Sequence, residues 1–313
     1  MNMKHTNYLY AFGLILSLGL TSCGGGEDDP VINPLPEPSV TAGPNYLARI
    51  EVPKMESGNL FIQHSTKEGN DSVMAYCLEY NPDKYHSRWV AFRFDALTRQ
   101  KNTKRPDVDP FTDDPSISNA YKIESSGFGK TYKDWTNIAH NDLSFDRGHI
   151  CASADRLYSV EANAMTFYMT NMSPQISDFN QGFWNAFEIH ALDLCQNQNF
   201  SDTLYVVKGG TIADNQTMGY IQRKNGSKVV IPKHYFMALL AVKNGSYKSI
   251  GFYMEHKAYG YKYASDVPAD KLKEKVVTID QLEKNTGIDF FHNLPDNVEN
   301  SVESTCDPSE WGL

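Results

Sequence analysis

Three short segments near the middle of the chain hold most of the residue types that catalysis uses. They are residues 146–149 (Asp-Arg-Gly-His), residues 171–175 (Asn-Met-Ser-Pro-Gln) and residues 180–188, which begin with Asn and end with Glu. A histidine has a pKa close to neutral, so His149 can take a proton from water. Arg147 is two residues away, and therefore on the same face if the segment is a strand. This set suits attack of water on a phosphodiester, helped by a hard metal ion.

The third segment has the spacing of a helix, which we expect over residues 178–195. Asn180, Trp184 and Glu188 recur every four residues, and at about 100° per residue they fall within about 80° of one another. Trp184 would anchor this helix in the core, so that Asn180 and Glu188 point into a shared cleft. Mg²⁺ accepts an amide oxygen as a ligand, and Glu188 can bind the waters that Mg²⁺ keeps. Without the first segment, polar residues that merely solvate a helix would explain the same pattern.

The rest of the sequence predicts the elements that must hold these segments. Apolar or alternating runs predict strands over residues 59–64, 74–80, 88–95, 203–207, 234–242 and 247–253, a strand-like stretch over 167–171, and a strand leading into Asp146. Residues 96–120 are rich in Pro, Asp, Lys and Ser, which predicts a long surface excursion.

Capping residues predict three further helices. Ser159 can begin a short helix that runs through Met165, and Asp296 can cap a last helix. Thr278 opens a capping box, and Gly287 closes the helix that follows it. Strands dominate the middle and helices fall between them, so we expect the α+β class: one domain with a central, mainly antiparallel sheet and flanking helices.

The first 45 residues are interpreted as an export signal and a tether. Residues 1–22 place Lys4 before an apolar run, as in a signal peptide. Residues 20–23 (Leu-Thr-Ser-Cys) resemble a bacterial lipobox, which implies acylation of Cys23 and anchoring at the outer membrane, on its periplasmic or its cell-surface side. An ordinary secretory signal with an incidental cysteine is the alternative. Residues 23–45, rich in Gly, Pro and acidic residues, predict a disordered tether before a folded domain over 46–313.

Charge and cysteine content narrow the choice of partners. The net charge is −9, so the overall field does not attract polyanions, and any grip on nucleic acid must be local. An exported compartment permits disulfides, and four cysteines, Cys77, Cys151, Cys195 and Cys306, allow three full pairings. No Cys-x-x-Cys occurs, which argues against structural zinc. Cys151 is interpreted as packing or as part of a bridge rather than as a nucleophile.

The three catalytic segments resemble those of the DNA/RNA non-specific endonucleases, close to endonuclease G, with a ββα-metal active site. They occur in the family's order and at its approximate spacing. Residues 205–210, 231–236 and 278–291, which include Glu283, also resemble the family, so that the likeness covers about residues 60–294. The chain departs from the family's usual pattern at Lys208, where many members have threonine, and at Leu192, where some have arginine.

The resemblance implies a role for each site residue. His149 would be the general base, Asn180 the single protein ligand of Mg²⁺, which Mn²⁺ can replace, and Glu188 a carboxylate that binds the waters of the metal. Arg147 would lie near the scissile phosphate.

Three more residues are implied to bind the substrate. Asn171 and Gln175 would support the site or contact the nucleic acid, and Arg105 would contact a phosphate upstream. The implied activity is metal-dependent hydrolysis of DNA and RNA to 5′-phosphate products with little sequence specificity; a homodimer is left open. The alternatives are a degenerate family member that acts as a binding module, and a phosphodiesterase for a substrate other than nucleic acid.

Overall fold

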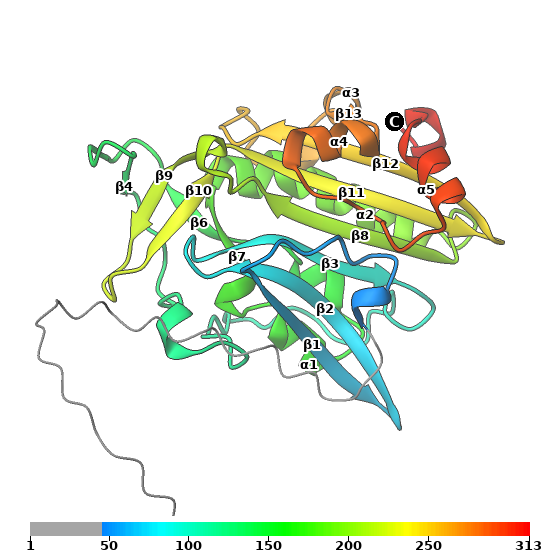
Figure 1. The fold of residues 1–313 in the computed structure, drawn as a ribbon, viewed down its shortest axis with the longest axis horizontal. Helices are drawn as coiled ribbons and strands as arrows, with labels where there is room; N and C mark the ends of the chain where they lie inside the picture. Colours follow the sequence, from blue (N-terminus) through cyan, green and yellow to red (C-terminus); the bar gives the residue numbers. More distant parts are fainter. Residues whose placement is uncertain (1–45) are drawn as a thin grey trace, which may run out of the picture. The chain divides into compact units, whose positions relative to one another are not determined.

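A seven-stranded sheet in the order β1-β2-β3-β8-β11-β12-β13 lies at the centre of the fold (Figure 1). The structure is a computed structural model that describes residues 46–313, so the expected signal peptide, tether and acylated Cys23 lie outside the described residues. Neighbouring strands in the sheet are all antiparallel, which confirms the expected α+β class. In this part of the chain no helix has the length and apolarity needed to cross a membrane.

The described strands also form a four-stranded sheet, β10-β9-β4-β5, and a two-stranded sheet, β6-β7. The strands are β1 (Leu60–Glu68), β2 (Asp71–Asn81), β3 (His86–Phe94), β4 (Tyr132–Lys133), β5 (Ala139–His140), β6 (Phe145–His149), β7 (Met172–Ile176), β8 (Thr203–Gly210), β9 (Thr217–Gln222), β10 (Lys228–Pro232), β11 (His234–Lys243), β12 (Ser246–Glu255) and β13 (Val276–Val277). The helices are α1 (Val160–Met165), α2 (Asn185–Gln196), α3 (Ala269–Lys273), α4 (Ile279–Thr286) and α5 (Asp296–Glu303).

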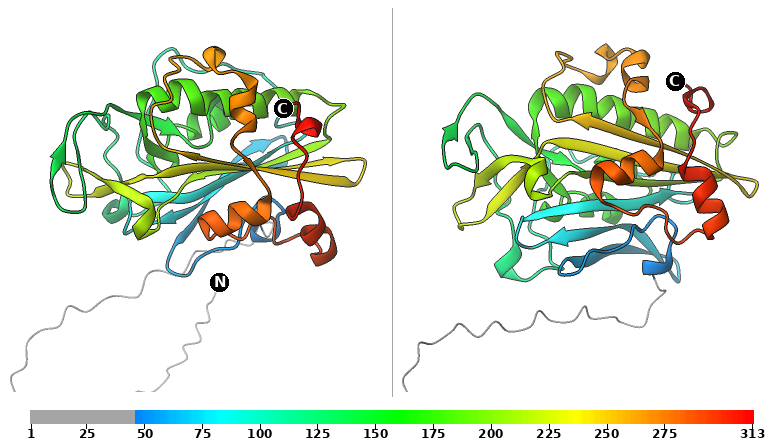
Figure 2. Two further views of the ribbon diagram at one scale, coloured as in Figure 1. Left: turned by 90° about the horizontal axis from the view of Figure 1, so that it is seen from above. Right: turned by 45° about the horizontal axis from the view of Figure 1, so that its top comes forward.

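Both faces of the central sheet are covered. Figure 1 and Figure 2 show α2 on one face and α4 and α5 on the other. Successive residues of a strand point to opposite faces, and β11 shows this directly: Met237 and Leu239 join the core under α2, while Ala238 and Leu240 join the core under α4. The continuous apolar run of this strand therefore reflects burial on both faces.

Several expected elements appear with different boundaries. Residues 167–171 are not a strand: a 3₁₀ turn, η4 (Met169–Asn171), leads into β7. The helix expected over 178–195 begins with a π-helical turn, η5 (Phe179–Trp184), before α2. The last helix is preceded by Pro295 as its capping residue rather than by Asp296. The sequence analysis did not predict β4, β5, β13, the hairpin β9-β10 or helix α3. Each of these elements has only two to six residues, too few to show a hydrophobic period.

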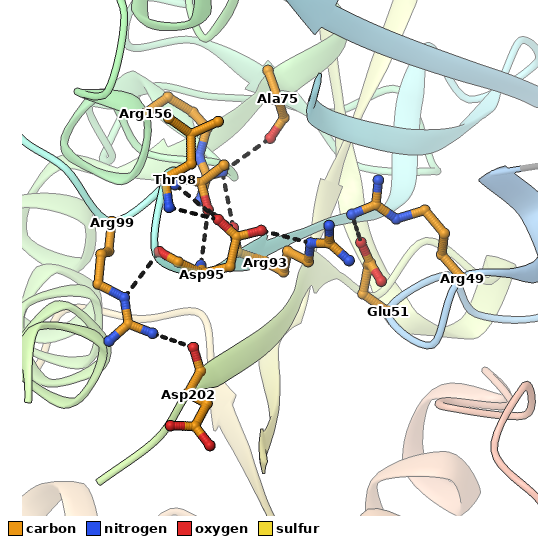
Figure 3. Close-up of polar contacts among 10 residues, drawn as sticks. Arg49, Glu51, Ala75, Arg93, Asp95, Thr98, Arg99, Arg156 and Asp202 are labelled. Carbon is orange, nitrogen blue, oxygen red and sulfur yellow. Dashed lines mark hydrogen bonds and ion pairs between the residues drawn. The ribbon is translucent and has the colours of Figure 1, made fainter. Parts of the chain in front are cut away.

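The excursion over residues 96–120 is only partly a surface feature. Asp114 is buried and accepts a hydrogen bond from Thr170, and the Nε2 atom of His64 lies 3.0 Å from its carboxylate. At the start of the excursion, Asp95 accepts hydrogen bonds from the backbone of Leu97 and Thr98 and so forms a tight turn (Figure 3). Asp114 thus ties the excursion to the rest of the domain.

A buried arginine holds the loop that follows β6 against the central sheet. Arg156, in the 3₁₀ turn η3 (Ser153–Arg156), donates to the carbonyl oxygens of Ala75 at 3.2 Å and Arg93 at 3.1 Å (Figure 3). Its guanidinium also lies 4.4 Å from the centre of the Phe92 ring. These contacts fix η3, and with it the neighbouring Asp155, at the base of the candidate site.

Candidate active site

Strands β6 and β7 and the helical segment after them bring the three catalytic segments together. The strands pair antiparallel, with His149 opposite Met172 and Arg147 opposite Pro174. The turn η5 and helix α2 follow β7 directly, which completes a strand-strand-helix unit. Beside this unit lies a cleft of about 710 Å³. Its lining includes five of the residues singled out in the sequence: Arg105, Arg147, His149, Asn180 and Glu188.

His149 is set between two aromatic rings. Phe167 meets it edge-on with ring centres 4.9 Å apart, and Phe111 lies at 5.7 Å on a tilt. Burial, followed by the positive charge of Arg105, lowers the pKa of His149 to about 3. The imidazole is therefore neutral at physiological pH, which is the form that can accept a proton.

Each of the two aromatic rings also carries an arginine. The guanidinium of Arg147 lies 3.6 Å from the centre of Phe111, and that of Arg105 lies 5.2 Å from the centre of Phe167. Arg147 donates to the carbonyl oxygen of Ser125 at 2.6 Å. Arg105 makes two hydrogen bonds to Asp109, at 2.8 and 2.7 Å. The excursion that supplies Arg105 and Phe111 therefore contributes to the cleft, as the resemblance implied for Arg105 but not for Phe111.

Asp146 orients the Asn180 amide. The Asn180 amide nitrogen donates to Asp146 at 2.9 Å, and the same carboxylate accepts from Ser177 at 2.8 Å and from Gln181 at 2.9 Å. Asn180 lines the cleft, its amide nitrogen is engaged, and among the described residues no hydrogen bond to its carbonyl oxygen is found. An oriented amide oxygen fits a hard divalent cation that retains most of its water.

The π-helical turn changes how Asn180 is positioned. A π-helix has more residues per turn than an α-helix, so the expected 100° spacing does not apply between Asn180 and Trp184. Trp184 is fully buried, as expected, and Asn180 and Glu188 both reach the cleft. Gly182 lets the turn approach Tyr261 closely, because the Cβ atom of any other residue would lie 2.0 Å from the Tyr261 carbonyl oxygen.

Glu188 has a buried cationic partner that the sequence did not reveal. Lys208 of β8 lies 3.1 Å from Glu188 and 2.7 Å from Asp155, and its side chain is only 1% exposed. Burial raises the pKa of Glu188 to about 7, and the charge of Lys208 opposes that rise. Burial works to lower the pKa of Lys208, but Asp155 and Glu188 raise it well above its ordinary value. The sequence does contain a signal for this ion pair: Lys208 lies at the end of an apolar strand. A lysine that is buried there requires an acidic partner.

Asn171 and Gln175 lie outside the cleft lining, and both are fully buried. Asn171 accepts from the backbone of Cys151 at 2.8 Å and donates to the Cys151 and Thr166 carbonyls, so it holds the chain beyond His149. Gln175 packs against Gly148, where a Cβ atom would lie 2.0 Å from its amide oxygen. Their positions fit support of the site rather than contact with a substrate. The space beside Gly148 is occupied by Gln175, not kept for a ligand.

The cysteines take no part in the site. Cys77, Cys151, Cys195 and Cys306 are unpaired, so none of the three pairings allowed by the sequence occurs. Cys151 is fully buried, and burial raises its pKa well above the ordinary value. It packs in the core, as one of the two sequence interpretations held, and does not form a bridge.

Comparison with known proteins gives consistent matches. The family model for DNA/RNA non-specific endonucleases matches residues 56–297. A nuclease from Nostoc sp. is 28% identical over 74% of this chain and 76% of that protein, and mitochondrial endonuclease G from Homo sapiens is 26% identical over 70% and 68%. A chain in the crystal structure of the EndoG/EndoGI complex has a TM-score of 0.53 at 19% identity, covering 76% of this chain and 89% of that chain.

The fold and these matches define a hydrolytic nuclease. The chain belongs to the DNA/RNA non-specific endonuclease family, a family of metal-dependent nucleases. Both the expected family and the expectation of an enzyme are confirmed.

Proposed function

We propose that this protein hydrolyses DNA and RNA without sequence specificity, with His149 as the general base. The observation that carries the proposal is the convergence of His149, Arg147 and Asn180 on one cleft. These residues come from separate segments of the chain, and each meets a requirement of phosphodiester hydrolysis. The neutral imidazole of His149 supports its role, because a protonated ring could not accept a proton from water.

The residues of the cleft divide the chemistry among them. His149 takes the proton of a water that attacks phosphorus, and Arg147 stabilises the negative charge that grows on the phosphate oxygens. Arg105 binds a neighbouring phosphate in exchange for part of its contact with Asp109. Glu188, held by Lys208, accepts hydrogen bonds from water in the cleft. Because these contacts are made to the phosphate backbone and not to the bases, cleavage should show little sequence specificity.

Asn180 is the residue that would hold the metal. Mg²⁺, or Mn²⁺ in its place, would neutralise the phosphate and stabilise the leaving 3′ oxygen. The role of Asp146 is to keep the Asn180 amide turned so that its oxygen faces the cleft. Products would then carry 5′ phosphates.

A cleavage assay on plasmid, single-stranded DNA and RNA tests the proposal. Digestion should require Mg²⁺ or Mn²⁺ and stop with EDTA, and product ends should ligate without prior phosphorylation. His149→Ala should slow cleavage by roughly 10²–10⁴-fold, while Asn180→Ala should raise the metal concentration needed. Absence of cleavage of all three substrates would support the binding-module alternative if the protein still bound nucleic acid. Cleavage of small phosphodiesters alone would support the other alternative.

We also propose that the protein is exported and anchored at the outer membrane through acylated Cys23. The support is the apolar leader and the lipobox-like residues 20–23. Cys23→Ala should move the protein from the membrane fraction to the soluble fraction. Protease added to whole cells should remove it if it faces outward and spare it if it faces the periplasm. An unchanged membrane fraction for Cys23→Ala would refute the anchor.

A further inference from the structure

Three carboxylates meet on the face of the central sheet opposite α2. Asp280 and Glu283 belong to α4, and Glu303 ends α5. One oxygen atom from each lies within 4.8 Å of the others. Figure 2 shows α4 and α5 on the opposite side of the sheet from α2, so this cluster is separate from the nuclease cleft.

The negative charge of this cluster has no local counterpart. Among residues 46–313, none of the three carboxylates forms an ion pair with a lysine or arginine. Asp289 and Glu299 add further negative charge around Glu283 and Glu303. Lys54 is exposed and lies 3.5 Å from Asp289, outside the cluster. Like charges this close destabilise the fold unless a proton or a cation intervenes.

Glu303 shows that the cluster is more than a surface patch. Only 5% of Glu303 is exposed, and its Oε1 atom is buried without a hydrogen-bond partner. A buried polar atom that lacks a partner costs free energy, and a buried ionised carboxylate costs more. Glu283 is held in place by one oxygen, which accepts from the Phe290 amide at 2.8 Å. Glu303 thus brings a buried carboxylate with an unpartnered oxygen atom to this group of acidic side chains.

We propose that Asp280, Glu283 and Glu303 form a binding site for a divalent cation, and that Ca²⁺ is the ion it selects. Two oxygens on opposite sides of a Ca²⁺ ion are about 4.8 Å apart, twice the usual Ca–O distance, so the spacing of the cluster admits the ion. Ca²⁺ accepts several carboxylates in an irregular arrangement. Mg²⁺ demands a regular octahedron and prefers water to a third carboxylate. The bound ion would tie the C-terminal helix α5 to α4.

Burial and the neighbouring acids raise the pKa of Glu303 to about 9 and that of Glu283 to about 7. Burial and like charge therefore both disfavour the ionised carboxylates when no cation is bound.

Thermal unfolding in EDTA and in Ca²⁺ tests the site. The test uses the full chain carrying Asn180→Ala, which removes the proposed metal ligand of the nuclease cleft. Ca²⁺ at a hundredfold over its Kd should raise Tm by about 4 °C or more. Glu303→Gln or Asp280→Asn, added to that background, should weaken Ca²⁺ binding at least tenfold by calorimetry and remove the rise in Tm. Glu310→Gln, which removes an exposed acid outside the cluster, is the matched control and should keep the rise.

Metal-free Tm separates loss of the site from loss of the fold. Glu303→Gln removes a buried acid from among like charges, so in EDTA its Tm should equal or exceed that of the parent. The proposal is overturned if Ca²⁺ leaves Tm of the Asn180→Ala protein unchanged, or if Glu303→Gln keeps the full rise. A larger rise with Mg²⁺ than with Ca²⁺ would overturn the choice of ion.

Discussion

His149 owes its neutral state to its surroundings rather than to its residue type. Burial between Phe111 and Phe167 and the charge of Arg105 lower its pKa, and Lys208 and Arg147 act in the same direction. Asp109 opposes the shift. An isolated histidine would lose most of its neutral form below pH 6.5. In this site the neutral form persists to about pH 3.

The pH dependence of cleavage follows from that shift. Because the pKa of His149 is lowered, the base itself stays available as the pH falls. In the Glu188→Gln protein, whose residue 188 cannot titrate, kcat/KM should therefore be nearly constant from pH 7 to pH 5. An unperturbed histidine would lose roughly 97% of its neutral form at pH 5. Initial rates at saturating metal across pH 4–8 measure the effect. A half-maximal rate near pH 6.5 would contradict it.

Lys208 is the residue whose importance was least visible in the sequence. It stands where many family members have threonine, and it bridges Asp155 and Glu188 within the base of the cleft. Leu192 lines the same cleft at a position where some members have arginine. The positive charge near Glu188 is therefore supplied by a central strand in this chain.

Removal of the Lys208 charge should lower both the stability of the domain and its rate of cleavage. Lys208→Met leaves two carboxylates buried without a cation, and breaking such a pair costs about 3–5 kcal/mol. Urea unfolding measures this loss, and the exposed Lys224→Met is the control, expected to change stability by less than about 0.5 kcal/mol. Adding Glu188→Gln and Asp155→Asn to Lys208→Met should recover part of the stability. No recovery would mean that Lys208 acts through packing instead.

At the level of elements, the pair β6-β7 is the part of the fold that sets the base in place. Gly148 lies opposite Ser173, and the side chain of Gln175 fills the space beside its Cα atom. A glycine at this position is thus a packing requirement of the strand pair. The π-helical turn after β7 plays a similar part for Asn180.

Gly148→Ala tests how closely this strand pair is packed. The added methyl would overlap Gln175, and overpacking of this kind costs about 1–3 kcal/mol. The free energy of unfolding and the cleavage rate should both fall, because His149 is the next residue on the strand. Gly127→Ala is the matched control for stability, since a Cβ atom there meets nothing within 4 Å. Equal stability of the two variants would show that Gln175 moves aside freely.

For the whole molecule, the four described cysteines are stable as thiols because the sheet and helices bury them. Cys77, Cys151 and Cys195 are buried and Cys306 is half-buried, and burial raises the pKa of Cys195 to about 11. The core therefore does not depend on a disulfide, even if the protein is exported.

Reduction should leave the stability of the domain unchanged. Dithiothreitol should not shift Tm, whereas loss of a native disulfide in a small secreted domain costs about 2–5 kcal/mol. Among the four cysteines of residues 46–313, Cys306 alone should react quickly with a thiol reagent in the folded protein, and denaturation should expose the other three. A fall of several degrees in Tm on reduction would contradict the unpaired state.

Much of the fold could be predicted because its signals are local. The strands near residues 60–94 and 203–253 carry long apolar runs. As expected, Ser159 and Thr278 cap their helices, and their side chains accept hydrogen bonds from the backbone amides of Ala162 and Gln281. Short elements escaped prediction, because β4, β5 and β13 depend on pairing with distant strands. The π-helical turn was also missed, since its residues have the same spacing pattern as an ordinary α-helix.

The sequence by itself determined the family, the class of fold and the residue types at the site, because these depend on the order and spacing of nearby residues. Only the tertiary structure decided that His149 is neutral, that Asp146 turns the Asn180 amide and that Lys208 lies beside Glu188. It also placed Asn171 and Gln175 in the interior, outside the cleft lining. The physical reason is that desolvation and hydrogen-bond partners come from segments far apart in the chain, and packing alone brings them together.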